Sequence, residues 1–241
     1  MRIAADPLTS AACLLRGLKM LGQPGLRQFV WIPLLINLTV YGIGVWVGVQ
    51  YFSAVLNGLI PAGLEWLRWL LWPVFAVLLA GIVFFSFTLI ANLIAAPFYG
   101  QLADKVLNQL GVTLPRPETH GILQSLLMDI AAELRRMAYF AVRSTPLLVL
   151  SVIPGLNLIA PLLWLVFGAW SLSLEYFSYP LEAHGLRFER QRELAAAHRL
   201  DAMGFGGAVM LGLSIPVINL LIPPAAVIGA TLYVTERRLP P

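Results

Sequence analysis

The chain has 241 residues, of which 59% are hydrophobic and 12% are charged, and its mean hydropathy is +0.81. A soluble domain carries about 25% charged and about 45–50% apolar residues, so this composition excludes an ordinary soluble domain and favours an integral membrane protein. The net charge of +4 is modest and the basic residues are dispersed, which argues against a nucleic-acid partner. The single cysteine, Cys13, excludes an intrachain disulfide and has no companions at zinc spacing.

The first twenty residues contain scattered charges and do not have the pattern of a cleaved signal peptide. Pro24 and Gly25 then end the first predicted helix, and the next is expected to begin near Leu26. Free backbone N–H groups and the positive end of a helix would therefore lie beside the guanidinium of Arg27, a combination that binds sulfate-like anions. In the alternative interpretation, which the local pattern by itself favours, Arg27 contacts lipid phosphates.

Two long charge-free stretches follow, residues 28–64 and residues 69–103. Each exceeds the roughly 20 residues that cross about 30 Å of hydrocarbon, so both are predicted to be transmembrane. Tryptophans between and beside them are typical of a membrane interface. The polar residues Asn37 and Asn92 lie inside these stretches, where they are candidates either for lining a pore or for interhelical hydrogen bonds.

The other two charge-free stretches, residues 144–174 and residues 202–235, are each interrupted by the same pattern, Pro-x-x-Asn-Leu-x-x-Pro. Paired prolines end one helix and begin another, so the chain is expected to turn back at Pro154 and again at Pro216. The remaining arms have ten to fourteen residues, too few to cross a bilayer. We therefore predict two re-entrant hairpins whose turns are sheltered by protein, with four kinked spans as the alternative.

Amphipathic helices are predicted over residues 122–139 and 186–200, at one membrane face. The first of them contributes to a charged set that is either an ion-pair network at the mouth of a pathway or a solvated face. This set consists of Asp129, Glu133, Arg135, Arg136 and Arg143. Because both hairpins return to the side they leave, every basic residue except Arg68 shares that face, and the positive-inside rule places both termini in the cytoplasm.

Taken together, these patterns predict an all-α integral membrane protein with one domain over residues 1–241, two transmembrane helices, two half-penetrating hairpins and amphipathic cytoplasmic helices. No nucleophile motif, phosphate loop or dinucleotide fingerprint is present, and the histidines are isolated in the sequence. We therefore expect no enzyme activity, no cofactor and no metal.

Four sequence segments, in the order in which they occur, resemble the CysZ sulfate permease family of bacteria. The segments are Pro24-Gly25-Leu26-Arg27, Ile32-Pro33-Leu34-Leu35-Ile36-Asn37, Ala95-Ala96-Pro97-Phe98-Tyr99 and Glu175-Tyr176 with Pro180. That family has two membrane-crossing helices and two half-penetrating hairpins, and it delivers sulfate to the cytoplasm for cysteine synthesis. The resemblance implies that Gly25, Leu26 and Arg27 form a sulfate-binding motif, and that Gln28 stands where relatives often carry a second arginine.

The resemblance also implies a homo-oligomer, in some relatives with protomers in opposite orientations, which the charge asymmetry does not suggest. The resulting hypothesis is a sulfate permease of the bacterial inner membrane, in contact with membrane lipid, with sulfite as a second candidate substrate. Alternatives are a non-transporting membrane scaffold and an ion-coupled oxyanion transporter, although the latter usually places ionisable residues at mid-membrane. The candidate pore or pore-mouth residues are Asn37, Asn92, Glu133, Arg135 and Arg136.

Overall fold

The computed structural model describes residues 6–61, 64–114, 122–215 and 218–237, and the side chains of residues 88, 89, 91–93, 96 and 122–132 lie outside that description. The described residues are helical and contain no strand, which confirms the all-α prediction. They form two compact units, one of residues 28–98 and one of residues 1–27 with 99–241.

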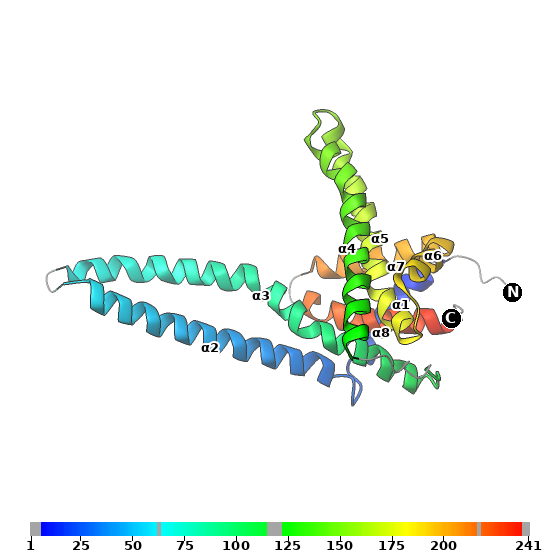
Figure 1. Ribbon diagram of the computed structural model, residues 1–241, viewed down its shortest axis with the longest axis horizontal. Coiled ribbons are helices and arrows are strands. Elements are labelled where there is room, and N and C mark those ends of the chain that lie inside the picture. The colour runs from blue at the N-terminus through cyan, green and yellow to red at the C-terminus, as the bar shows by residue number, and fades with distance from the viewer. Residues whose placement is uncertain (1–5, 62–63, 115–121, 216–217, 238–241) are drawn as a thin grey trace. The chain divides into compact units, whose positions relative to one another are not determined.

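The unit of residues 28–98 is an antiparallel pair of helices, α2 (Gln28–Leu59) and the first part of α3 (Glu65–Gln109) (Figure 1). The ring of Phe52 stacks on Phe75 with 3.9 Å between centroids, and the Tyr41 hydroxyl donates a hydrogen bond of 2.7 Å to Ser86. Both helices have the length and composition to cross a membrane. Their large apolar side chains are widely exposed, as expected of a surface that faces hydrocarbon rather than water.

The second unit contains the end of α3 and six further α-helices among the described residues. These are α1 (Pro7–Met20), α4 (Ile122–Val152), α5 (Ala160–Ala183), α6 (Phe188–Ala197), α7 (Arg199–Leu213) and α8 (Ile222–Glu236). Helix α8 is apolar on all sides, and every residue from Ile222 to Val234 is buried. Helices α1, α5 and α7 pack against it. A helix that is apolar all round has no face for water, so it takes the central position of this unit.

Glycines allow the helices of this unit to pack backbone to backbone. A Cβ atom at Gly17 of α1 would overlap the carbonyl oxygen of Ala225 in α8, and one at Gly229 of α8 would lie 2.8 Å from the carbonyl oxygen of Cys13. Close approach through small residues is the usual way in which helices associate in membranes, where apolar side chains gain little by leaving lipid.

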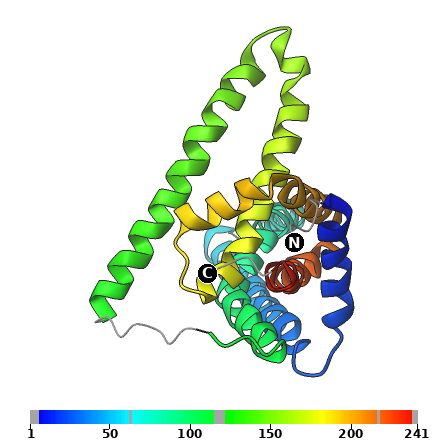
Figure 2. The ribbon, with the colours of Figure 1, turned by 90° about the vertical axis from the view of Figure 1, so that its right-hand side faces the viewer.

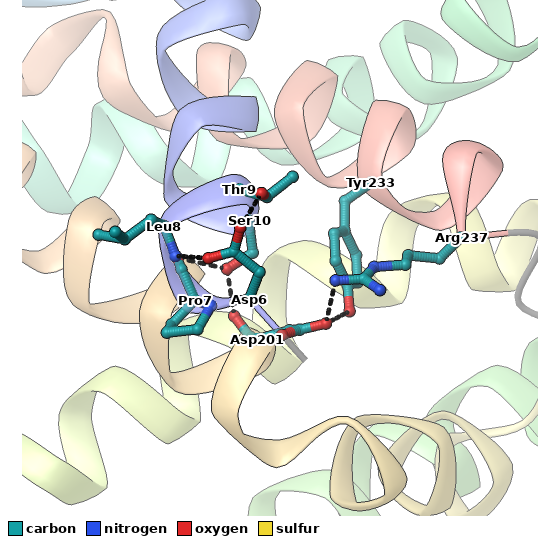
Figure 3. A network of polar contacts seen from close by, with 8 residues as sticks. All are labelled: Asp6, Pro7, Leu8, Thr9, Ser10, Asp201, Tyr233 and Arg237. Carbon is teal, nitrogen blue, oxygen red and sulfur yellow. Dashed lines mark hydrogen bonds and ion pairs between the residues drawn. The ribbon is translucent and has the colours of Figure 1, made fainter. Parts of the chain in front are cut away.

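A buried polar network also joins α1, α7 and α8 (Figure 3). The Ser10 hydroxyl of α1 donates a hydrogen bond of 2.7 Å to the backbone carbonyl of Asp201, in the first turn of α7. The Tyr233 hydroxyl of α8 donates one of 2.8 Å to the Asp201 carboxylate, which also forms an ion pair with Arg237. Asp201 and Ser10 are completely buried, so these bonds replace water that neither group can reach.

The described parts of the two proline patterns share a short turn, whereas Pro216 itself lies outside the described residues. Short 3-10 turns occupy Leu156–Leu158 and Ile218–Leu220, and in each the asparagine N–H donates a 3.0 Å hydrogen bond, Asn157 to the Ile153 carbonyl and Asn219 to the Ile215 carbonyl. Figure 2 shows the chain reversing between α4 and α5, and α7 packs against α8 after the second turn. The predicted reversals are therefore confirmed.

The arms of the first hairpin differ from the prediction. Helix α4 continues without interruption from the amphipathic segment into the apolar arm, giving 31 residues, and α5 extends to Ala183, giving 24 residues. The prediction of separate short arms is wrong here because both helices continue through their polar flanks, α5 even past Pro180, and α5 becomes a third helix long and apolar enough to cross a membrane. In the second hairpin, α7 and α8 have 15 residues each, about 22 Å, which matches the short arms expected.

The turns themselves are exposed in the single chain. The side chains of Asn157 and Asn219 are both solvent-accessible, and so are apolar neighbours such as Leu158, which is 82% exposed. The prediction that the protein shelters these side chains is therefore wrong for the isolated chain, because each turn packs mainly against the two helices that flank it. Whether the hairpins stop inside the bilayer remains the prediction made from their sequence.

Candidate anion site

The segment between α1 and α2 is a compact turn built around the carbonyl of Gln23. The N–H of Leu26 donates to this oxygen at 3.1 Å and that of Arg27 at 3.4 Å. Gly25 has a φ of +92°, a conformation that a residue with a Cβ atom adopts at a steric penalty. The Leu26 side chain is completely buried and anchors the turn, whereas the Arg27 side chain is exposed. The turn thus presents the Arg27 guanidinium to the surface.

This geometry changes the role expected of Leu26. The sequence suggested free backbone N–H groups at Gly25 and Leu26, but the Leu26 N–H is already used inside the turn, so that part of the prediction is wrong. Among the described residues, the structure gives no hydrogen bond to the Gly25 N–H. The donors available to an anion are therefore the Gly25 amide and the Arg27 guanidinium. Gln28, also exposed, begins α2 directly after Arg27.

Lys105, near the end of α3, lies against the same turn. Its Nζ is 3.3 Å and its Cε 3.5 Å from the position that a Cβ atom would take at Gly25. A side chain at residue 25 would displace the flexible end of Lys105 slightly, but the positive φ is the stronger reason for glycine here. Sequence analysis treated Lys105 only as one of many basic residues on the cytoplasmic side, and no local motif links it to Gly25. The structure adds a second cation to a site where the sequence offered one.

The charged set on α4 forms ion pairs with α5 and α6. Arg135 lies 3.5 Å from the carboxylate of Glu189, and Arg136 lies 3.7 Å from that of Glu175. Hydrogen bonding to its own backbone N–H, together with Arg135, lowers the pKa of Glu189 below its ordinary value. Glu133 is exposed, and the side chain of Asp129 lies outside the described residues. Arg135 and Arg136 thus form ion pairs with carboxylates outside the predicted set, and the role of the set at a pathway mouth stays a prediction.

Asn37 belongs to the α2–α3 pair and is only 1% exposed. Neither its amide nitrogen nor its carbonyl oxygen has a hydrogen-bond partner among the described residues, an arrangement that is unfavourable in a protein interior. The Tyr41–Ser86 hydrogen bond aligns the two antiparallel helices, so Asn37, four residues before Tyr41, lies level with residue 90, four residues after Ser86. Asn92 is two residues farther, about 3 Å along the helix axis. The Asn92 side chain lies outside the described residues.

Comparison with known proteins places this architecture in one family. Residues 13–224 match the family described as Sulfate transporter CysZ/Etoposide-induced protein 2.4. The sulfate transporter CysZ of Pseudomonas aeruginosa PAO1 is 41% identical over 224 residues, 90% of either chain. That of Pseudomonas fluorescens Pf0-1 is 41% identical over 239 residues, 97% of this chain and 96% of the relative. The resemblance seen in the sequence motifs is confirmed, and the chain belongs to the sulfate transporter CysZ/etoposide-induced protein 2.4 family.

Proposed function

We propose that this protein is a sulfate permease of the bacterial inner membrane that supplies sulfate for assimilation and cysteine biosynthesis. The observation that carries the proposal is 41% identity, over nearly the whole of both chains, to proteins named sulfate transporter. The charge-free helices of the α2–α3 pair agree with a membrane location. Sulfite, a smaller sulfur oxyanion with three oxygens that can also carry two negative charges, is the second candidate substrate.

The turn at Gly25 is the proposed capture site. A planar guanidinium donates two parallel hydrogen bonds to two oxygens of an anion, which Arg27 is exposed to do, and the Gly25 amide adds a backbone donor. Lys105 supplies the second positive charge for a dianion. In relatives a second arginine often follows the first; this chain has Gln28 there, and Lys105 provides the missing charge. Leu26 contributes through its buried side chain, which holds the turn in shape.

Neutral donors suit the pathway beyond capture. A fixed charge deep in the protein would hold a dianion too tightly for release, whereas the amides of Asn37 and Asn92 bind it weakly. The buried amide of Asn37, which has no hydrogen-bond partner among the described residues, supports this role. Glu133, Arg135 and Arg136 are the candidates for a pathway mouth, where ion pairs modulate the local field. Cytoplasmic termini, half-penetrating hairpins, a homo-oligomer and bound membrane lipid complete the proposal.

Uptake of radiolabelled sulfate into liposomes that contain the purified protein tests this function. We expect flux above that of empty liposomes, and Arg27→Ala should weaken sulfate affinity tenfold or more, roughly the loss of one charge-assisted hydrogen bond. Arg199→Ala, which removes an exposed arginine at the start of α7, is the matched control and should transport as the wild type. Absence of flux with folded protein would favour the scaffold alternative.

Two further arms of the same assay separate the remaining alternatives. Competition by unlabelled sulfite tests the second substrate, since a shared site predicts inhibition. An imposed proton gradient tests ion coupling, because a simple permease should follow the sulfate gradient alone.

A further inference from the structure

Two arginines from different helices converge on one tyrosine ring. The guanidinium carbon of Arg143 in α4 lies 4.8 Å from the centroid of the Tyr139 ring, and that of Arg192 in α6 lies 5.3 Å from it. Each contact is a favourable cation–π interaction. The two charges are therefore no more than about 10 Å apart, close to the Debye length of about 8 Å at physiological ionic strength, so they repel each other.

Three neighbouring arginines of α4 and α6 form ion pairs with carboxylates. The balanced pairs are Arg135 with Glu189, Arg136 with Glu175 and Arg190 with Glu193. For Arg143 and Arg192, no carboxylate lies within ion-pair distance in the part of the chain that the structure describes. Two cations held together without a counter-charge are suited to an anion from outside the chain.

The pair lies where the hairpin changes from polar to apolar. The Tyr139 hydroxyl accepts a hydrogen bond of 3.1 Å from the indole N–H of Trp170 in α5. The charge-free part of this hairpin begins immediately after Arg143 and ends immediately before Glu175, so this bond crosses the hairpin at the boundary. Tyrosine, tryptophan and arginine at such a boundary are typical of the headgroup level of a membrane.

Exposed apolar side chains lie close to Arg143 along the same arm of the hairpin. Val142, next to Arg143 in the chain, is 71% exposed, and Leu148 and Val149, farther along the same arm, are exposed as well. Arg143 is exposed and Arg192 is half-buried, so both are within reach of a bound group. A ligand that fits this surface combines an anionic head with an apolar tail.

We propose that Arg143 and Arg192, positioned by the Tyr139 ring, bind the headgroup phosphate of an anionic phospholipid. The planar guanidinium matches phosphate oxygens, and the acyl chains would lie along the exposed apolar arm of α4. This site is built from α4, α5 and α6 and shares no residue with the turn at Gly25. Sulfate and inorganic phosphate carry the same oxygen chemistry, but only a lipid also covers the apolar surface.

Native mass spectrometry of the full chain in neutral detergent, titrated with phosphatidylglycerol or phosphatidylcholine, tests the proposal. We expect the wild type to bind phosphatidylglycerol more tightly than phosphatidylcholine, and Arg143→Gln and Arg192→Gln each to weaken phosphatidylglycerol binding about fivefold. Arg190→Gln removes a charge from the same helix α6 but from a cation that Glu193 balances, so it should bind like the wild type.

Equal phosphatidylglycerol affinity in the wild type and both single variants would overturn the proposal, and so would equal losses in all three arginine variants. If inorganic phosphate or sulfate at millimolar concentration displaces the bound phosphatidylglycerol, the site binds a free oxyanion and the lipid assignment is wrong. Tyr139→Leu tests the role of the ring separately, because this variant keeps both arginines and removes the ring that positions them. It should reduce the preference for phosphatidylglycerol, and an unchanged preference would contradict the role assigned to the ring.

Discussion

The carboxylate of Asp201 and the guanidinium of Arg237 form a buried ion pair, with 2.9 Å between Oδ2 and Nη2. The side chain of Asp201 is inaccessible and that of Arg237 is 7% exposed. The pair joins the first turn of α7 to the residue that ends α8, and therefore closes the open end of the second hairpin. Figure 3 shows both side chains meeting beside Tyr233.

Arg237→Met is expected to destabilise the fold strongly, because it leaves the Asp201 carboxylate buried without its cation. Removing one partner of a buried pair costs about 3–5 kcal/mol, which corresponds to a decrease of roughly 10 °C in the apparent melting temperature of a chain of this size. Thermal unfolding in detergent, followed by circular dichroism, measures the change.

Arg16→Met provides the matched control for this ion pair. Arg16 joins α1 to the same end of α8 through a hydrogen bond of 2.9 Å to Glu236, but both side chains are about half exposed. An exposed pair contributes at most about 1 kcal/mol. An equal decrease in melting temperature for Arg237→Met and Arg16→Met would show that burial does not make the Asp201 pair more important for stability. The double variant Asp201→Leu with Arg237→Met should recover much of the lost stability.

Lys105→Gln is expected to weaken sulfate binding about tenfold while leaving the fold intact, because it removes one of two cations at the Gly25 turn. Lys105→Arg keeps the charge and should retain most of the affinity. Adding Gln28→Arg to the Lys105→Gln variant should recover binding, since residue 28 directly follows Arg27. Isothermal titration calorimetry measures the sulfate affinity of all three variants. If Lys105→Gln binds sulfate as tightly as the wild type, Lys105 does not belong to the site, and the role proposed for Arg27 is unaffected.

Asn37→Leu separates a transport role from a structural one. Because the Asn37 amide has no partner among the described residues, replacing it with an apolar group of similar size should leave thermal stability unchanged or higher. If the amide binds sulfate in transit, the same variant should decrease uptake into liposomes. A variant with normal uptake and lower stability would mean that Asn37 is a packing residue.

Cysteine labelling tests whether the two hairpins stop inside the bilayer. The native Cys13 is buried, so a Cys13→Ala background gives little labelling of its own. In that background, Asn157→Cys and Asn219→Cys should resist a membrane-impermeant maleimide added from the periplasmic side of intact cells. Pro61→Cys, in the exposed connection between α2 and α3, should react and serves as the positive control. Efficient labelling at residue 157 or 219 would establish that the hairpin spans the membrane.

The sequence by itself determined the properties that depend on neighbouring residues. Its charge-free stretches identified a membrane protein, and the repeated proline pattern located two reversals that the structure forms with the same hydrogen bond, from Asn157 and from Asn219. Pro24 and Gly25 similarly located the turn that presents Arg27. Proline and glycine act through their own backbone, and hydropathy is a sum over adjacent residues, so both can be read without a fold.

Only the tertiary structure decided which distant residues meet. Lys105 at Gly25, Arg237 at Asp201, and Arg192 beside Arg143 each join helices that are far apart in the chain. None of these pairs has a local signature, because a charged residue looks the same in sequence whether it faces water, a carboxylate or another cation. The packing of α1, α5 and α7 around α8 is likewise a tertiary property, and it depends on glycines whose partners the sequence cannot name.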